Sequence, residues 1–323
     1  MRRALLPLVP LYAAAVTGKN QAYNRRWFRQ QRLRAPVVSI GNLSVGGSGK
    51  TPLTIRLAEL LRDRGVAVDV LSRGYGRHSH QVLCVDPAGL WQDYGDEPLL
   101  IAQQARVPVY VAASRYAAGL LAESASPTPR LHLLDDGFQH RRLARDLDIV
   151  VLHRSDLTAT LLPAGRLREP FSSLRRADVL VLRDEDHELE SQLRLRGFRQ
   201  PIWWMTRRLE IPDVTSAIAF CAIARPAEFL AGLTGRSIPA SRTWRDHHVW
   251  TDRDIAELIE LQHRHSAAAF LTTEKDLVRL SPAQRCKMEQ AAPLHAVRLQ
   301  VQLRDKAATI DHLLDLLASG RRQ

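Results

Sequence analysis

Short runs of apolar residues, many of them β-branched, alternate with amphipathic segments along the first two thirds of the chain. We predict strands at 37–40, 66–72, 107–112, 130–136, 147–153 and 177–183. Between them, apolar residues recur at helical spacing, most clearly at 53–61 and 96–105. Short apolar strands that alternate with helices are typical of a parallel sheet covered on both faces. The pattern therefore predicts an α/β fold in which helices flank a parallel sheet.

A second group of elements follows a highly charged stretch at 184–200. It contains predicted strands at 216–223, 267–276 and 294–303, and predicted helices at 225–233, 252–265 and about 306–318. With 323 residues, the chain is long enough for two domains. We therefore expect a larger α/β core at 35–204 and a smaller α/β domain at 205–323, preceded by a separate segment at 1–34.

The charge of the chain is concentrated near its N-terminus. Residues 1–58 hold ten of the 46 Lys and Arg residues and no acidic residue, whereas the rest of the chain carries 36 basic and 34 acidic side chains. This asymmetry argues against a general nucleic-acid-binding protein and for a local contact with an anionic surface. The three cysteines, Cys84, Cys221 and Cys286, form no C-x-x-C pair. Neither a disulfide framework nor a zinc ribbon is predicted, and a reducing cytoplasm fits.

An apolar stretch at 4–17 lies beside these N-terminal charges. It is shorter than the roughly 20 residues that a helix needs to span a bilayer. We expect it to lie in a membrane interface, with Trp27 and Phe28 at the boundary and the basic segment 24–34 against anionic headgroups. The alternatives are a secretory signal peptide and a solvated basic helix packed on the edge of the core.

A glycine-rich loop lies between the first predicted strand and the helix at 53–61. It reads S-V-G-G-S-G-K-T over residues 44–51, and this context predicts a phosphate-binding loop. Glycines let backbone N–H groups converge on an anion, and the helix N-terminus adds partial positive charge. Lys50 is expected to reach the β- and γ-phosphates and Thr51 to bind Mg²⁺. Ser44 stands where the usual pattern has its first glycine, so an ordinary glycine-rich turn is the alternative.

Two carboxylates, Asp135 and Asp136, end the predicted strand at 130–136. Carboxylates at this position of a nucleotide-binding sheet hold Mg²⁺ directly or through water. Adjacent side chains of an extended strand point in opposite directions, so one of the two faces the nucleotide better than the other. A plain D-D-G turn is the alternative.

Other polar residues have both a chemical and a structural interpretation. Asp96 precedes Glu97 and Pro98 at a predicted helix start, where it could cap the helix, orient an attacking hydroxyl or deprotonate it. Arg166 and Arg168 suit phosphate groups, or belong to a solvated loop. His247 and His248 follow an aspartate, although a single histidine is more often a surface residue. The sequence T-T-E-K-D at 272–276 lacks the intervening residue of a guanine-reading motif, which argues against a GTPase.

Taken in order, these motifs resemble one family. They are G-N-L-S-V-G-G-S-G-K-T-P (41–52), S-R-G-Y-G-R (72–77), G-D-E-P (95–98), L-D-D-G-F-Q-H (134–140), P-A-G-R-L-R-E-P (163–170), D-H-H (246–248) and T-T-E-K-D (272–276). The ordered set closely resembles the tetraacyldisaccharide 4′-kinases, the lipid A 4′-kinases. This family's loop also lacks the first glycine, which accounts for Ser44.

The resemblance implies an activity, a location and an architecture. The family transfers the γ-phosphate of ATP, with Mg²⁺, to the 4′-hydroxyl of a tetraacylated diglucosamine 1-phosphate and forms lipid IV-A in lipid A and lipopolysaccharide biosynthesis. It acts as a peripheral or monotopic protein at the cytoplasmic face of the inner membrane. The resemblance also implies a P-loop kinase core, a smaller C-terminal α/β domain and an N-terminal membrane-associating helix. The expected partners are the lipid substrate and an anionic membrane surface; no nucleic acid is expected, and no protein partner is evident from the sequence.

The resemblance also implies roles for individual residues. Asp96 would be the catalytic base, paired with His247 of the D-H-H motif, and Lys50 would act at the phosphates. Thr51, Asp135 and Asp136 would serve the metal site, and Glu97, Arg115 and Arg168 are further candidates for positioning ATP or the lipid phosphate. The residues expected to hold the nucleotide are Ser44, Val45, Gly46, Gly47, Ser48, Gly49, Lys50, Thr51 and Gln139.

Two other classes of function remain open from the sequence. A P-loop NTPase that acts as a switch or metallochaperone would hydrolyse nucleotide without a lipid acceptor. A membrane-associated scaffold with a degenerate loop would bind nucleotide without turnover.

Overall fold

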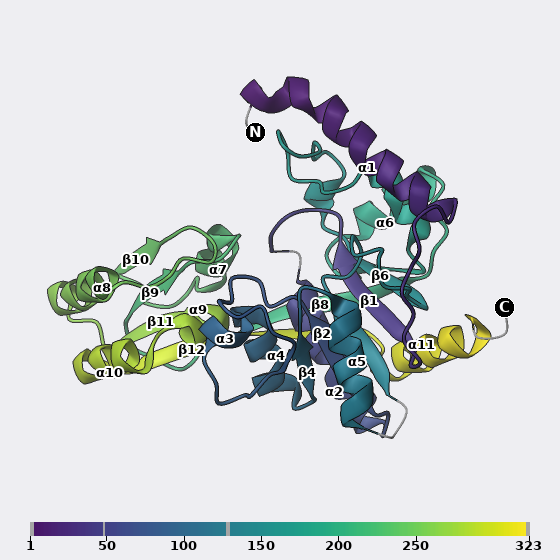
Figure 1. Cartoon of the computed structure of the whole chain (residues 1–323). Helices are drawn as coiled ribbons and strands as arrows, with labels where there is room; N and C mark the ends of the chain where they lie inside the picture. Colours follow the sequence, from purple (N-terminus) through teal and green to yellow (C-terminus); the bar gives the residue numbers. More distant parts are fainter. Residues whose placement is uncertain (1–2, 48, 127–129, 321–323) are drawn as a thin grey trace.

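The computed structural model describes residues 3–47, 49–126 and 130–320. These residues form one twelve-stranded sheet in the order β10-β9-β11-β12-β8-β7-β6-β1-β5-β2-β4-β3, flanked by helices (Figure 1). The strands are β1 (Val37–Asn42), β2 (Val68–Ser72), β3 (Leu83–Cys84), β4 (Val109–Val111), β5 (Leu131–Asp135), β6 (Leu147–Val151), β7 (Val179–Arg183), β8 (Ile202–Glu210), β9 (Ala217–Cys221), β10 (Ala240–Thr243), β11 (Ala269–Thr273) and β12 (Leu294–Leu303). The mostly parallel sheet with flanking helices confirms the predicted fold class.

The α-helices connect these strands. They are α1 (Val9–Asn24), α2 (Lys50–Asp63), α3 (Trp91–Tyr94), α4 (Asp96–Ala105), α5 (Arg115–Ala125), α6 (His187–Leu195), α7 (Pro226–Gly232), α8 (Asp252–His265), α9 (Glu274–Arg279), α10 (Pro282–Ala291) and α11 (Lys306–Gly320). Three 3₁₀ helices are η1 (Arg3–Leu8), η2 (Arg154–Asp156) and η3 (Phe171–Arg176). The predicted helices at 96–105 and 252–265 coincide with α4 and α8.

Two long strands, β8 and β12, join two parallel parts of the sheet. The first residues of β8 pair with β7, whereas its later residues pair antiparallel with β12 from Arg298 to Leu303. The first residues of β12 pair parallel with β11. We call β1–β8 with α2–α6 the N-terminal lobe, and β9–β12 with α7–α10 the C-terminal lobe. The expected boundary at 204/205 falls inside β8, and the division into domains stays a prediction.

The C-terminal helix returns to the N-terminal lobe. Ile310, Leu313 and Leu317 of α11 are buried in the same apolar cluster as Leu53 and Leu57 of α2. Figure 1 shows the yellow α11 on the opposite side of the molecule from the C-terminal lobe. Strands β1, β2, β5 and β6 are buried along their whole length, as their apolar sequences predict for a sheet covered on both faces.

The N-terminal segment is helical from Arg3 to Asn24, first as η1 and then as α1. Pro10 is in the first turn of α1, where its missing N–H costs no hydrogen bond. Figure 1 shows α1 at the outer edge of the N-terminal lobe, away from the sheet. Among the described helices, none is long and apolar enough to cross a membrane.

One predicted strand is shorter than expected. The segment 267–276 was predicted as a strand throughout, but β11 ends at Thr273 and α9 begins at Glu274. The hydroxyl of Thr273 accepts a hydrogen bond from the backbone N–H of Asp276 at 3.1 Å and caps the new helix. The apolar residues end with β11. The polar residues that follow form a helix because Thr273 caps its first turn.

Candidate active site

The glycine loop connects β1 to α2 in the conformation that its sequence predicts. Gly46, Gly47 and Gly49 all have positive φ, at 83°, 38° and 93°, which residues with a side chain rarely adopt. Ser48 lies outside the described residues. Lys50 and Thr51 are the first two residues of α2, and Gly49 is its N-cap, so the glycines directly precede the helix N-terminus. Ser44 is fully buried and Val45 is exposed.

Lys50 is held by groups at the ends of β1 and β5. Its Nζ donates to Asn42 Oδ1 at 3.0 Å and lies 3.5 Å from a carboxylate oxygen of Asp136. Arg168 donates to both carboxylate oxygens of Asp136, at 2.9 and 2.7 Å, and also to the Asn42 side chain. Burial acts to raise the pKa of Asp136, but Lys50 and Arg168 outweigh it and hold the pKa well below its usual range. Asp136 is therefore a carboxylate between two cations.

Asp135, the last residue of β5, is buried against α2 and the end of β2. The Thr54 hydroxyl of α2 donates to it at 3.2 Å, and the Ser72 hydroxyl at the end of β2 lies 3.5 Å away. Burial raises the pKa of Asp135 to about 7, with further contributions from the carboxylates of Glu97 and Asp136. The two adjacent aspartates thus have different environments. The predicted strand at 130–136 ends at Asp135, and Asp136 has φ of 49°, so a turn after the strand separates the two carboxylates rather than the alternation of an extended strand.

The donor set around Asp135 fits Mg²⁺. The hydroxyl of Thr51 and the carboxylates of Asp135 and Asp136 are the oxygen ligands that Mg²⁺ prefers. The pKa of Asp135 is raised first by burial and then by the nearby carboxylates, and a cation bound beside it would stabilise its charged form. Within the described residues, no group of three or more His, Cys, Asp or Glu side chains is arranged to hold a metal by itself. Mg²⁺ bound with ATP takes most of its remaining ligands from phosphates and water.

Asp96 is the first residue of α4 and is almost fully buried. Gly95, with φ of 93°, is the N-cap of this helix, and Asp96 Oδ1 accepts a hydrogen bond from the backbone N–H of Glu97 at 2.8 Å, so one carboxylate oxygen stabilises the helix start. A Cβ atom at Gly95 would lie 2.9 Å from the Cα of Gly74, so the S-R-G-Y-G-R loop packs directly on the residue before Asp96. Close packing of these two glycines fixes the start of α4 and the position of the carboxylate.

His247 reaches Asp96 from the C-terminal lobe. Its Nδ1 lies 3.0 Å from Asp96 Oδ2, and its backbone has φ of 59°, which is rare for a residue with a side chain. The ammonium of Lys275 lies 3.3 Å from His247 Nε2. Because an ammonium can only donate, Nε2 accepts, and we assign the ring proton to Nδ1, which donates to Asp96. The ring of Tyr75 lies against His247, with centroids 5.1 Å apart.

Positive charges keep Asp96 ionised. Burial acts to raise its pKa, but the hydrogen bond from His247 and the charges of Lys275 and Arg279 outweigh this effect and lower the pKa to about 2. Lys275 also donates to Glu97 at 3.1 Å. Burial acts to lower the pKa of Lys275, but the surrounding carboxylates, Glu97 first among them, raise it above its usual value. The site therefore holds a buried ionised carboxylate next to an imidazole.

Sequence reasoning missed Lys275, Arg279 and Asn42 as site residues. Lys275 lies in the T-T-E-K-D motif, and Asn42 follows Gly41 in the first motif, so both belonged to recognised patterns without an assigned role. Arg279 belongs to none of the motifs recognised in the sequence. Its Nε lies 3.7 Å from Asp96 Oδ2, because α9 places it one turn after Lys275.

The remaining candidates are distributed around this centre. Arg115 is buried at the start of α5, and burial lowers its pKa to about 10, with Arg73 adding to the effect and Asp136 and Asp135 opposing it. Gln139 donates to the backbone oxygen of Asn42 at 2.9 Å. His248 points elsewhere, because its Nε2 lies 2.9 Å from Asp254. The geometry thus distinguishes His247 from His248, while the roles of all these residues stay predictions.

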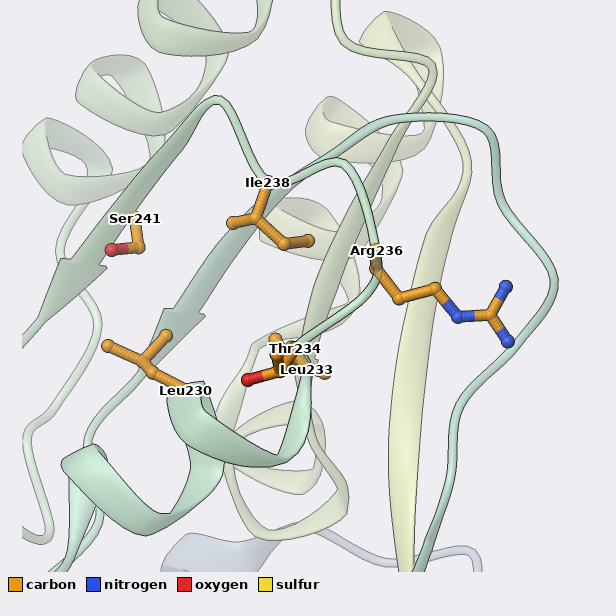
Figure 2. Close-up of a pocket in the computed structure, with 6 residues that line it drawn as sticks. All are labelled: Leu230, Leu233, Thr234, Arg236, Ile238 and Ser241. Atoms are coloured by element: carbon orange, nitrogen blue, oxygen red, sulfur yellow. The ribbon is translucent and has the colours of Figure 1, made fainter.

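A small pocket lies outside this site. It has a volume of about 220 Å³ and lies between α7 and β10 of the C-terminal lobe (Figure 2). Figure 2 shows the side chain of Arg236 extending away from the other lining residues. The lining residues are Leu230, Leu233, Thr234, Arg236, Ile238 and Ser241, none of which is a candidate site residue.

Comparisons with known proteins find relatives over nearly the whole chain. A family model described as tetraacyldisaccharide-1-P 4′-kinase (LpxK) matches residues 1–318. The chain is 43% identical to a tetraacyldisaccharide 4′-kinase of Koribacter versatilis, over 96% of this chain and 98% of the relative. It is 37% identical to that of Aquifex aeolicus, over 87% and 90%. A crystal structure of Aquifex aeolicus LpxK in complex with ATP matches with a TM-score of 0.78 and 33% identity, covering 98% of this chain and 99% of the other.

Proposed function

The chain belongs to the tetraacyldisaccharide-1-P 4′-kinase family, and we propose that it transfers the γ-phosphoryl group of ATP to the 4′-hydroxyl of a tetraacylated diglucosamine 1-phosphate. The product is lipid IV-A, an intermediate of lipid A biosynthesis. The observation that carries this proposal is the match over nearly the whole chain to relatives named for this activity. It does not favour a nucleotide-hydrolysing switch or metallochaperone.

The glycine loop is the proposed ATP site. Backbone N–H groups of residues 44–49 and the start of α2 would surround the phosphates, and Lys50 would exchange its contact with Asp136 for the phosphate oxygens. Gln139, beside Asn42, completes the proposed nucleotide contacts. Bound between Thr51, Asp135 and Asp136, Mg²⁺ would neutralise phosphate charge. When Lys50 leaves Asp136 for the phosphates, Asp136 stays paired with Arg168. This carboxylate therefore has a cationic partner both with and without ATP.

Asp96 is the proposed catalytic base. The hydroxyl oxygen attacks the γ-phosphorus while its proton passes to Asp96, and the bond from phosphorus to the β–γ bridging oxygen breaks to release ADP. A carboxylate with a pKa of about 2 is a weak base, so its main contribution is to hold and orient the hydroxyl, and it accepts the proton late. His247 donates to Asp96 through Nδ1 and fixes the orientation of the carboxylate.

The remaining cations suit an anionic lipid. Arg115 and Arg168 lie close to Asp135 and Asp136 and are proposed to position ATP or the lipid phosphate. The N-terminal helix extends this surface, because the Tyr12 hydroxyl of α1 donates to the backbone oxygen of Arg168 at 2.9 Å. We propose that α1 lies on the cytoplasmic face of the inner membrane and that lipid reaches the site along it.

Labelled nucleotide tests the proposal. Purified protein is incubated with ATP labelled at the γ-phosphate, Mg²⁺ and the tetraacyldisaccharide 1-phosphate in detergent. We expect label in the lipid only when Mg²⁺ is present. Loss of ATP without labelled lipid would indicate a nucleotide-hydrolysing switch, and binding without turnover would indicate a scaffold.

A further inference from the structure

An arginine of the C-terminal lobe lies directly against the glycine loop. Arg225 precedes α7, in the segment that follows β9. A Cβ atom added to Gly47 would lie 2.9 Å from Cγ of Arg225, and one added to Gly46 would lie 2.9 Å from Cβ of Ala224. The loop therefore needs glycine at both positions partly because residues 224–225 pack on it.

The guanidinium of Arg225 is only partly used by the protein. Its Nη1 donates to Glu228 Oε1 at 2.7 Å, and its side chain is 11% exposed. Its Nε and Nη2 are buried and have no hydrogen-bond partner among the described residues. Buried N–H donors of a charged group are costly to leave unpaired. This arginine therefore has two free donors next to a loop that binds phosphate.

The surroundings of Arg225 carry more positive than negative charge. Glu228 also accepts from Arg183 at 3.3 Å and from Arg207 at 3.1 Å, so three guanidinium groups share one carboxylate. His153, 3.9 Å from Glu228, is neutral at neutral pH and does not add to this positive charge, because burial and the arginines, Arg225 first among them, lower its pKa to about 4. An anion at this place would be stabilised by the uncompensated charge.

The excess charge extends to the loop itself. Arg166 Nη2 donates to the backbone oxygen of Val45 at 3.2 Å, on the same loop that Arg225 contacts. Lys50 and Arg168, in contrast, are occupied by Asp136 in this structure. The loop thus has cations on two sides: Lys50 and Arg168 share the carboxylate of Asp136, whereas Arg225 shares the carboxylate of Glu228 with two other arginines.

We propose that Arg225 is a further catalytic residue, a guanidinium that the C-terminal lobe brings against the terminal phosphates of ATP at the glycine loop. This inference rests on the proposed kinase function. As the hydroxyl oxygen bonds to the γ-phosphorus and the bridging bond breaks, negative charge accumulates on the bridging oxygen that leaves with ADP. Nε and Nη2 of Arg225 would donate to the phosphate oxygens and stabilise that charge, and the hydroxyl proton goes to Asp96. Arginines that act in this way in other phosphoryl-transfer enzymes contribute about 10³–10⁵-fold to turnover.

The same lobe supplies two groups to the reaction. Arg225 follows β9 and His247 follows β10, and these strands are hydrogen-bonded neighbours. A rigid lobe therefore holds the arginine against the glycine loop and the imidazole against Asp96 at the same time. Turnover would then depend on both contacts.

Substitution of Arg225 tests the proposal. We compare Arg225→Ala and Arg225→Lys with Arg236→Ala, a matched control on the same lobe whose guanidinium pairs with exposed Asp213. Lipid phosphorylation gives kcat and the KM values for ATP and lipid. Binding of ADP alone and of ADP with Mg²⁺ and aluminium fluoride, which imitates the transferring phosphoryl group, is measured by calorimetry on the full chain. Melting temperatures check folding.

We expect Arg225→Ala to lower kcat by at least about 100-fold and to weaken binding of ADP–aluminium fluoride similarly, while affinity for ADP alone changes by less than about threefold. Arg225→Lys should keep the fold but remain at least about tenfold impaired, because an ammonium lacks the guanidinium fork. A raised KM for lipid with unchanged kcat would assign the cluster to the lipid phosphate, and normal turnover would make the arginine structural. Either result overturns the proposal, whereas absence of lipid labelling in the unsubstituted protein would overturn the kinase function itself.

Discussion

The imidazole of His247 lies 3.0 Å from the carboxylate of Asp96, although 151 positions separate them in the chain. Asp96 begins a helix of the N-terminal lobe, and His247 follows β10 in the C-terminal lobe. Lys275 and Arg279, both from α9, surround the same carboxylate. A helix start in one lobe and a loop and helix in the other thus form a single ionised cluster.

Replacing Asp96 with asparagine should lower kcat by at least about 100-fold with little change in ATP affinity. The amide keeps the shape of the side chain but cannot take the hydroxyl proton. Turnover is measured by lipid phosphorylation and ATP affinity by calorimetry. Asp93→Asn, an exposed aspartate three residues earlier, is the matched control and should stay near normal. Near-normal turnover of Asp96→Asn would reduce Asp96 to a structural role.

The two histidines of the D-H-H motif should respond differently to substitution. His247→Ala removes the donor to Asp96, so we expect kcat to fall by about 10–100-fold. His247→Asn, whose amide can still donate, should recover part of that loss. His248→Ala should stay within a few-fold of normal turnover, because His248 pairs with Asp254 instead. The reverse order of effects would exclude His247 as the partner of Asp96.

Lys50 should be essential for phosphoryl transfer. Its ammonium is held between Asn42 and Asp136 and is the cation at the start of α2. Lys50→Ala should reduce accumulation of phosphorylated lipid by at least about 100-fold, because the phosphates lose a direct charge contact. Lys287→Ala, which removes an exposed lysine paired with Asp252, is the control. Lipid that accumulates at the normal pace in Lys50→Ala would contradict the role of the loop.

The requirement for Mg²⁺ should increase as the pH falls below neutrality. The pKa of Asp135 is raised to about 7, so below this pH the carboxyl is neutral and must lose a proton before it ligates a cation. Protons and Mg²⁺ then compete, and the half-saturating Mg²⁺ concentration should rise by up to about tenfold per pH unit below 7. Asp96, with a pKa of about 2, stays ionised throughout this range. Titrations of activity with Mg²⁺ at pH 6, 7 and 8 measure the effect.

Asp135→Asn distinguishes this mechanism from a general effect of pH. The amide cannot titrate, so the variant should need more Mg²⁺ at every pH and show a weaker pH dependence of that requirement. A requirement that changes equally with pH in both proteins would exclude Asp135 as the titrating group.

The sequence predicted the strands of the N-terminal lobe well because their signal is local. The apolar runs that became β1, β2, β5 and β6 are buried throughout, so burial on both faces leaves a continuous pattern. The alternating strand β8 was missed, because it belongs to the N-terminal sheet at one end and to the pair with β12 at the other. That change of partner depends on residues far away in the chain.

The candidate site shows the same limit. The glycine loop and the Asp135–Asp136 pair are short motifs at the end of a strand, which sequence reasoning recognises. Arg279 and Arg225 are not part of a local pattern, and their relation to Asp96 and Gly47 exists only once two lobes meet. In an arginine-rich chain, composition does not distinguish the few arginines that reach the site from those on the surface.

Membrane binding should depend on a few exposed apolar side chains near the N-terminus. Leu8, Leu11 and Trp27 are 49%, 72% and 70% exposed, although each is large and apolar. Deleting residues 1–34 would not separate membrane binding from folding, since Leu33 is buried in the core and its loss would perturb folding. Leu8→Glu combined with Leu11→Glu avoids this problem.

The double variant should bind vesicles of phosphatidylethanolamine and phosphatidylglycerol at least about tenfold more weakly, because burying one such side chain contributes about 1.5–3 kcal/mol. Sedimentation with vesicles gives the partition coefficient, and lipid phosphorylation in detergent should stay near normal. Leu120→Glu, at an exposed position of α5, is the matched control. Because the basic segment 24–34 remains, residual binding of the double variant should be electrostatic and should decrease steeply with salt. Equal partitioning of the variant and the unsubstituted protein would exclude α1 as the membrane contact.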